Sequence, residues 1–170
     1  MLQSPQANLF QNLIDRLALK VPAIRFIEQD LGQLENYQMR PAVSWPCCMI
    51  DIEEFNYSDL QNFHNQLAEG IVSLRIGLVK YTDSNNLTPT ATRENSLQYY
   101  EIEQQVVVAL HGWNPPGFSK LLRRASGTEK RDDDIRVRVL KFATSFTDSS
   151  AAPVTSKVPR PNAIINEGTI

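Results

Sequence analysis

The sequence predicts an α+β protein: a mainly antiparallel sheet with two helices packed on one face, plus a flexible C-terminal arm. Two segments carry apolar residues at the three- and four-residue spacing of an amphipathic helix, and others alternate apolar and polar residues as strands do. Strands also follow one another directly, which favours α+β over regular βαβ alternation. We therefore expect one domain at residues 1–148 and the arm at 149–170.

The first expected element is a helix. Its apolar stripe consists of Leu9, Phe10, Leu13, Ile14 and Leu17. Pro22 ends this helix, because a proline pushes the residue before it out of the helical region. A short strand is expected at Ala23–Asp30, and a loop containing Gly32 follows it.

The stretch between Pro41 and Pro46 is extended, because both prolines disfavour a helix. It leads into a strand at Cys47–Phe55, in which neighbouring side chains point to opposite faces. The next segment is ambiguous. Ser58 with Gln61 resembles a capping box, which favours a helical turn before Gly70.

The clearest strand is Ile71–Tyr81, where apolar residues alternate with smaller or charged ones. A polar loop then leads into a second long helix at Ala91–His111, which Gly112 terminates. Its expected apolar stripe consists of Leu97, Tyr100, Val107 and Leu110.

Two more strands are expected at Lys120–Ser126 and Ile135–Phe146, joined by the charged turn GTEKRDDD. From Thr147 onward the chain is rich in Ser, Thr, Pro and Asn and has few large apolar residues. Such a segment buries too little surface to offset its own ordering entropy. We expect it to order only against a partner.

The bulk composition argues against several classes of function. The chain has 170 residues and a net charge of −2, so no overall charge attracts it to nucleic acid or an anionic membrane. Its apolar runs are far too short for a membrane span. It has no pattern of a signal peptide, and its two cysteines are adjacent, so we expect a product made in a host cytoplasm.

Cys47 and Cys48 are expected to be core residues, because adjacent strand residues point apart and do not converge on zinc. A thiol nucleophile would need a base, and folding can bring His64 or His111 close to either cysteine. The alternative to a catalytic role is that His111 caps its helix and that His64 is solvated. We expect no cofactor.

Acidic residues provide the alternative of a small metal-dependent nuclease. Asp51 and Glu53 share one strand face, and the hairpin turn contains Asp132, Asp133 and Asp134. Against this reading, the EKRDDD run mixes charge signs as a solvated hairpin tip does, and no lysine or histidine stands out as a catalytic partner.

The last third of the chain is the expected interface between subunits, because mixed charges on a sheet suit a complementary protein surface. Few aromatic residues lie among the basic ones, so direct sequence-specific nucleic acid binding is not expected. Trp45 and Trp113 lie in proline-containing corners that either pin loops to the core or mark an interface. The interface residues that we predict are Arg123, Arg124, Lys130, Arg131, Asp132, Asp133, Asp134, Arg136 and Arg138.

Residues 9–148 show a particular order of elements. It includes the stretch RPAVSWPCCMIDI, which leads into an apolar strand, and a Trp/Pro-containing loop after the second helix. This pattern resembles the tail terminator or minor tail proteins of long-tailed bacteriophages and prophages, such as that of phage lambda. The vicinal cysteines and the long C-terminal segment have no match in this pattern.

The resemblance implies a non-enzymatic α+β subunit of the virion tail. It implies a hexameric ring that contacts the tail tube protein, stops tube growth and offers a surface to the head–neck connector protein. A neck or head–tail connector subunit is the alternative within the same class.

Overall fold

The computed structural model describes residues 4–35, 43–61, 64–79 and 83–152 of the chain. Its elements, in chain order, are α1 (Pro5–Lys20), β1 (Phe26–Gln29), β2 (Cys47–Asp59), β3 (Gln66–Val79), α2 (Thr90–Leu110), β4 (Leu122–Glu129) and β5 (Ile135–Asp148). The predicted α+β class and the predicted order of elements are confirmed. Most of the predicted arm, from residue 153 onward, lies outside the described residues.

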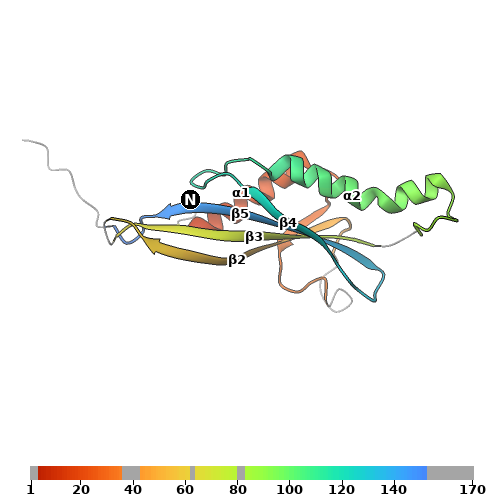
Figure 1. The fold of residues 1–170 in the computed structure, drawn as a ribbon, viewed down its shortest axis with the longest axis horizontal. Coiled ribbons are helices and arrows are strands. Elements are labelled where there is room, and N and C mark those ends of the chain that lie inside the picture. Colours follow the sequence, from red (N-terminus) through yellow and green to blue (C-terminus); the bar gives the residue numbers. More distant parts are fainter. Residues whose placement is uncertain (1–3, 36–42, 62–63, 80–82, 153–170) are drawn as a thin grey trace, which may run out of the picture.

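One sheet contains all five strands, in the order β1-β2-β3-β5-β4 (Figure 1). Three of its strand pairs are antiparallel, and only the short β1 runs parallel to its neighbour β2. The prediction of a mainly antiparallel sheet is therefore confirmed. The parallel pair lies at one end of the sheet, and β4 forms the other end.

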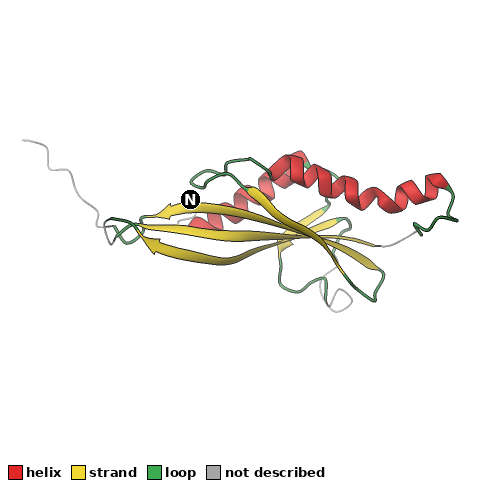
Figure 2. Ribbon diagram, viewed as in Figure 1, coloured by secondary structure: helices red, strands yellow, loops and turns green. Residues whose placement is uncertain are grey.

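Both helices cover the same face of the sheet, as predicted (Figure 2). The core lies between these two layers. It includes Leu13 and Leu17 of α1, Leu110 of α2, and Leu74 and Phe142 of the sheet, each fully buried. Ser4 caps the start of α1, since its Oγ accepts the N–H of Ala7 at 3.5 Å. The helix ends before Pro22, as predicted.

The opposite face of the sheet is covered over only part of its length. A second apolar cluster joins Cys47 and Met49 of β2 to Val137 of β5, beneath Leu34 and the partly buried Trp45. Trp113 packs against the first cluster instead. Both tryptophans thus contact core clusters, which agrees with the first of the two alternatives given for the proline-containing corners.

The predicted helical turn at Ser58 and Gln61 is wrong. Residue Ser58 lies inside β2, and its Oγ donates to the carbonyl of Leu67 on β3 at 3.5 Å. Gly70 does not separate two elements either, because it lies within β3. The ring of Phe55 lies where a β-carbon on Gly70 would stand, 2.5 Å away, so the glycine allows this close cross-strand contact.

The stripe predicted on α2 is confirmed only in its second half. Val107 and Leu110 are buried, whereas Leu97 and Tyr100 are 38% and 45% exposed. The first turns of α2 project past the ends of the strands (Figure 1), and farther along, Tyr99 and Tyr100 face the arginines Arg136 and Arg138 of β5 rather than apolar side chains. Within the described residues, no helix is long and apolar enough to cross a membrane.

Candidate assembly interface

The sheet has an open edge along the second half of β2. The pairing of β1 with β2 extends from Cys47 to Ile50, and the N–H of Asp30 adds one more bond to the Ile50 carbonyl. Beyond that point, residues 51–59 pair with β3 on one side. No described strand pairs with their other side, so this segment, which we call the β2 edge, presents free backbone groups.

The β2 edge is acidic. It contains no lysine or arginine, and its carboxylates are Asp51, Glu53, Glu54 and Asp59. Glu53 forms an ion pair with Lys141 of β5 at 2.7 Å, and Asp59 accepts a hydrogen bond from Gln66. Asp51 and Glu54 are exposed and have no hydrogen bond or ion pair among the described residues.

Burial raises the pKa of Asp51, and the nearby carboxylates of Asp30 and Glu53 raise it further, although Lys141 opposes them. Two other carboxylates, those of Asp30 and Glu53, therefore lie close enough to Asp51 to act on its charge.

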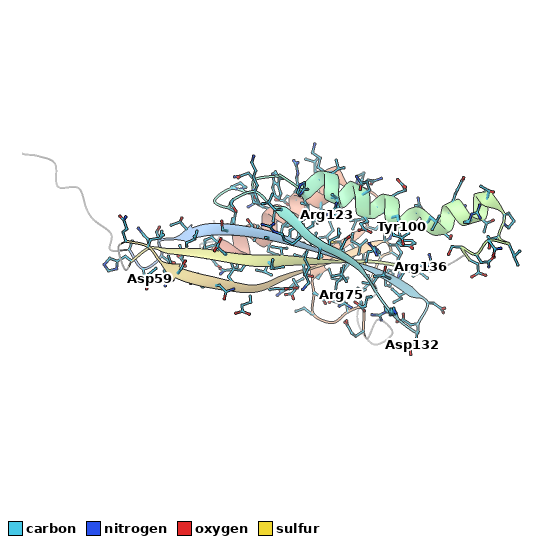
Figure 3. The ribbon with its side chains drawn as sticks, in the orientation of Figure 1. Asp59, Arg75, Tyr100, Arg123, Asp132 and Arg136 are labelled. Atoms are coloured by element: carbon cyan, nitrogen blue, oxygen red, sulfur yellow. The ribbon has the colours of Figure 1, made fainter. Side chains whose placement is uncertain are left out.

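The second open edge is β4 itself. Every residue from Leu122 to Thr128 is exposed, and only β5 pairs with this strand among the described elements. Arg123 and Arg124 give this edge a positive charge, and neither side chain has a partner within the described part of the chain. Figure 3 shows Arg123 on β4 beside the C-terminal part of α2.

A register shift between Arg123 and Ala125 leaves Arg124 as a bulged residue on β4. Glu54 and Arg124 both line a hollow of about 410 Å³ that also includes Ile71 and Ala143 on neighbouring strands. The hollow lies on the face away from the helices, since Ile71 and Ala143 are out of phase with the core residues Val72 and Phe142.

The nine residues predicted from sequence fall into two groups. Five of them are exposed: Arg123, Arg124, Lys130, Asp132 and Asp134. The other four are engaged in contacts within the subunit: Arg131, Asp133, Arg136 and Arg138. The first group is therefore available for contact with another molecule, and the second holds the hairpin in place.

Arg131 and Arg75 connect the β4–β5 hairpin to the loop after β1. The guanidinium of Arg131 contacts the carboxylates of Glu129 and Asp133 and donates to the carbonyl of Leu34, each at 2.6 Å. Arg75 contacts Glu129 at 2.8 Å and Asp30 at 3.0 Å. It also contacts Glu35.

Burial acts to lower the pKa of Arg75, but hydrogen bonds to carboxylates, that of Glu35 first, outweigh it and raise the pKa above the ordinary arginine value. At Arg131 the hydrogen bond to Asp133 is the main cause of a pKa that is likewise raised. The two guanidiniums therefore remain charged, and they fix the loop against the sheet.

Arg136 and Arg138 lie on one face of β5, since they are two residues apart on a strand, and both reach α2. Arg136 donates to the carbonyl of Ser96 at 3.0 Å and stacks over the ring of Tyr99. Arg138 forms a two-point ion pair with Glu103 and lies over Tyr100. These contacts attach the exposed half of α2 to the sheet.

The acids considered for a nuclease are distributed over two separate places. Asp51 lies mid-sheet opposite Ser73, whereas Asp132–Asp134 lie in the turn before β5, where Figure 3 shows Asp132 at the tip. Within residues 4–35, 43–61, 64–79 and 83–152, no group of three or more His, Cys, Asp or Glu side chains is arranged to hold a metal ion.

The two cysteines are fully buried on opposite faces, as predicted. Cys48 belongs to the core under the helices and Cys47 to the second cluster. Burial raises the pKa of the Cys47 thiol to about 12 and raises that of Cys48 further. Both therefore remain protonated thiols near neutral pH.

The two histidines lie where the non-catalytic interpretation places them, one as a helix cap and one in solvent. His111 is the C-cap of α2, and its Nδ1 accepts the N–H of Arg123 at 3.1 Å. His64 is exposed in the turn between β2 and β3.

Sequence reasoning missed Arg75, Tyr99 and Glu103. Each lies within an element that was predicted, but its partners are distant in the sequence, since Glu103 and Arg138 are separated by 35 positions and Arg75 and Glu129 by 54. One signal was available for Glu103: it lies four residues before Val107 on the predicted buried stripe of α2. A carboxylate in that place requires a cationic partner.

The fold is similar to a chain in a solved structure described as the virion of native gene transfer agent (GTA) particle, at 14% sequence identity and a TM-score of 0.47. The match covers 85% of this chain and 96% of that chain. No family model matches the chain, and no curated protein matches it.

Proposed function

We propose that the chain is the tail terminator of a phage or prophage: a structural protein that forms a ring at the end of the tail tube and acts by its shape rather than by chemistry on a substrate. The observation that carries the proposal is the pair of open edges at opposite ends of one sheet. A subunit with two such edges joins a neighbour on each side, as a ring requires. The resemblance of residues 9–148 to tail terminators supports the same role.

The arrangement of the layers supports a ring with a central channel. Both helices lie on one face of the sheet, and in the proposed ring, closed through the strand edges, this face is outside. The other face then lines the channel. Beyond the second apolar cluster this face is polar, with Asp51, Glu69 and Lys141, which suits contact with water.

The proposed mechanism is geometric. One surface of the ring binds the last ring of the tail tube protein, and the opposite surface no longer presents the polymerising face of the tube. That opposite surface then contacts the head–neck connector protein. We propose the exposed group, Arg123, Arg124, Lys130, Asp132 and Asp134, as contacts between proteins, because these side chains are free to reach a neighbour. The C-terminal arm is proposed as a second intersubunit contact.

Deletion of the gene from the phage or prophage that carries it tests this function. Tail lengths are measured in electron micrographs, with a plasmid copy of the gene as the control that restores them. Overlong tails support a terminator. Tails of normal length that fail to join heads support the neck or connector subunit instead. Normal tails on normal particles, together with a strict monomer in light scattering at high concentration, overturn both.

A further inference from the structure

The two open edges of the sheet carry opposite charges. Glu54 and Asp51 leave the β2 edge negative, and Arg123 and Arg124 leave β4 positive. The side chains of Glu54 and Arg124 lie on the same face of the sheet, because both line one hollow there. Two side chains on the same face of a sheet can meet when their strands become neighbours.

These charges discriminate between the ways in which two copies can join. Two β4 strands side by side would place one positive edge against another, and two β2 edges would place one negative edge against another. Like charges on neighbouring strands oppose pairing. The contact between β4 of one copy and the β2 edge of another is the combination that places opposite charges together.

We propose that β4 of one subunit pairs antiparallel with residues 51–59 of β2 in the next subunit, so that the sheet continues head to tail from copy to copy. This inference rests on the ring assembly proposed above and specifies its contact. The direction follows from the sheet. Since β2, β3, β5 and β4 alternate in direction, a copy added without inversion presents its β2 antiparallel to β4.

The two edges overlap in position where their opposite charges lie. β4 is level with β5 residues 137–143, whereas the β2 edge is level with β5 residues 141–148, through their shared pairing with β3. Arg123 pairs with Phe142 of β5, and Asp51 is level with Lys141, so a copy joined at this level brings the charged ends of the two edges together. A head-to-tail contact closes into a ring when the rotation between copies fits.

Charge reversal on each edge tests the pairing in the full chain. The β4 variant is Arg123→Glu with Arg124→Glu, and the β2 variant is Asp51→Lys with Glu54→Lys. A third variant combines all four substitutions. Controls with the same change in net charge are Lys20→Glu with Arg25→Glu, and Glu94→Lys with Glu101→Lys, since these side chains are exposed on other elements. Light scattering gives the mass of each species, and circular dichroism checks its fold.

We expect each edge variant alone to raise the concentration needed for assembly at least about tenfold, because like charges then meet across the contact. The four-substitution variant should assemble again, since opposite charges are restored with their signs exchanged. The two control pairs should assemble as the wild type does. Rescue in the combined variant also shows that loss in the single-edge variants is not misfolding.

Assembly that is unaffected by either edge variant overturns the proposed contact while leaving the terminator function standing, because a ring can form through other surfaces. Failure of the four-substitution variant to assemble, with a native circular dichroism spectrum, also overturns it. Conversely, normal tails after deletion of the gene refute the function without affecting a contact that the charge reversals support.

Discussion

The carboxylate of Glu103 receives two hydrogen bonds from the guanidinium of Arg138, with Nε to Oε2 at 2.6 Å and Nη2 to Oε1 at 3.0 Å. Both side chains are nearly buried, at 9% and 12% exposure. Arg138 also donates to the hydroxyl of Thr128, so one side chain connects α2, β5 and the exposed strand β4. The stability of the proposed β4 contact therefore depends in part on this ion pair.

Replacement of Glu103 by glutamine should destabilise the fold by about 2 kcal/mol, because a nearly buried guanidinium loses its charged partner. Unfolding in urea, followed by circular dichroism, measures the change. Glu101→Gln is the matched control, since Glu101 is exposed on the same helix, and it should change stability by less than about 0.5 kcal/mol. Equal stability of the two variants would contradict the role given to the ion pair.

A methyl group at Gly70 should destabilise the fold by about 1–3 kcal/mol, because it would enter the ring of Phe55 and force the two strands apart. Thermal or urea unfolding of Gly70→Ala measures this cost. Gly127→Ala on β4 is the control, because a β-carbon there has open space around it. The interpretation fails if both alanine variants are as stable as the wild type.

Local sequence patterns predicted the elements whose burial follows from their own periodicity. The alternation of Cys47, Cys48 and Met49 placed the two thiols on opposite faces, and the structure confirms it. The same local reasoning failed at Ser58, where a capping pattern was overridden by pairing between β2 and β3. Pairing with a distant strand is not visible in a window of a few residues.

The candidate interface was predicted only in part, for a related reason. Position on a strand identified Arg136 and Arg138 as neighbours on one face, but their ring and carboxylate partners come from α2. Periodicity assigns a face to a side chain and does not identify its contacts across the layers. From the sequence, Asp51 and Glu53 were interpreted as a possible catalytic pair. That they lie on an open strand edge follows from β1 pairing only with residues 47–50 of β2, and this pairing depends on the tertiary fold.

The thiols of Cys47 and Cys48 should resist alkylation in the native protein. Burial raises the pKa of Cys47 to about 12 and that of Cys48 as well, so the reactive thiolate is scarce near pH 8. Iodoacetamide labelling, followed by mass spectrometry, should be at least about a hundredfold slower in buffer than in denaturing urea. Ser126→Cys on the exposed β4 supplies a control thiol, which should react rapidly in both conditions. Rapid native labelling of the buried pair would contradict their assignment to the core.

The ion pair between Arg131 and Asp133 should make stability depend on pH in the acidic range. Arg131 lowers the pKa of Asp133 below its ordinary value of 3.8, so the folded state binds that proton less tightly than the unfolded state does. The stabilisation is therefore complete at pH values above the unfolded pKa and is lost as the pH falls through the folded one. Its size should stay below about 1 kcal/mol, because the carboxylate is 25% exposed.

Asp133→Asn should accordingly be less stable than the wild type at pH 7, and the difference should shrink as the pH is lowered toward 3. Urea unfolding at a series of pH values measures both curves. Asp132→Asn, at the exposed neighbouring position, is the control and should follow the wild-type curve. A difference between Asp133→Asn and the wild type that stays constant from pH 7 to pH 3 would mean that the substitution acts through packing or hydrogen bonding, because only an ionised Asp133 can stabilise the fold through its charge.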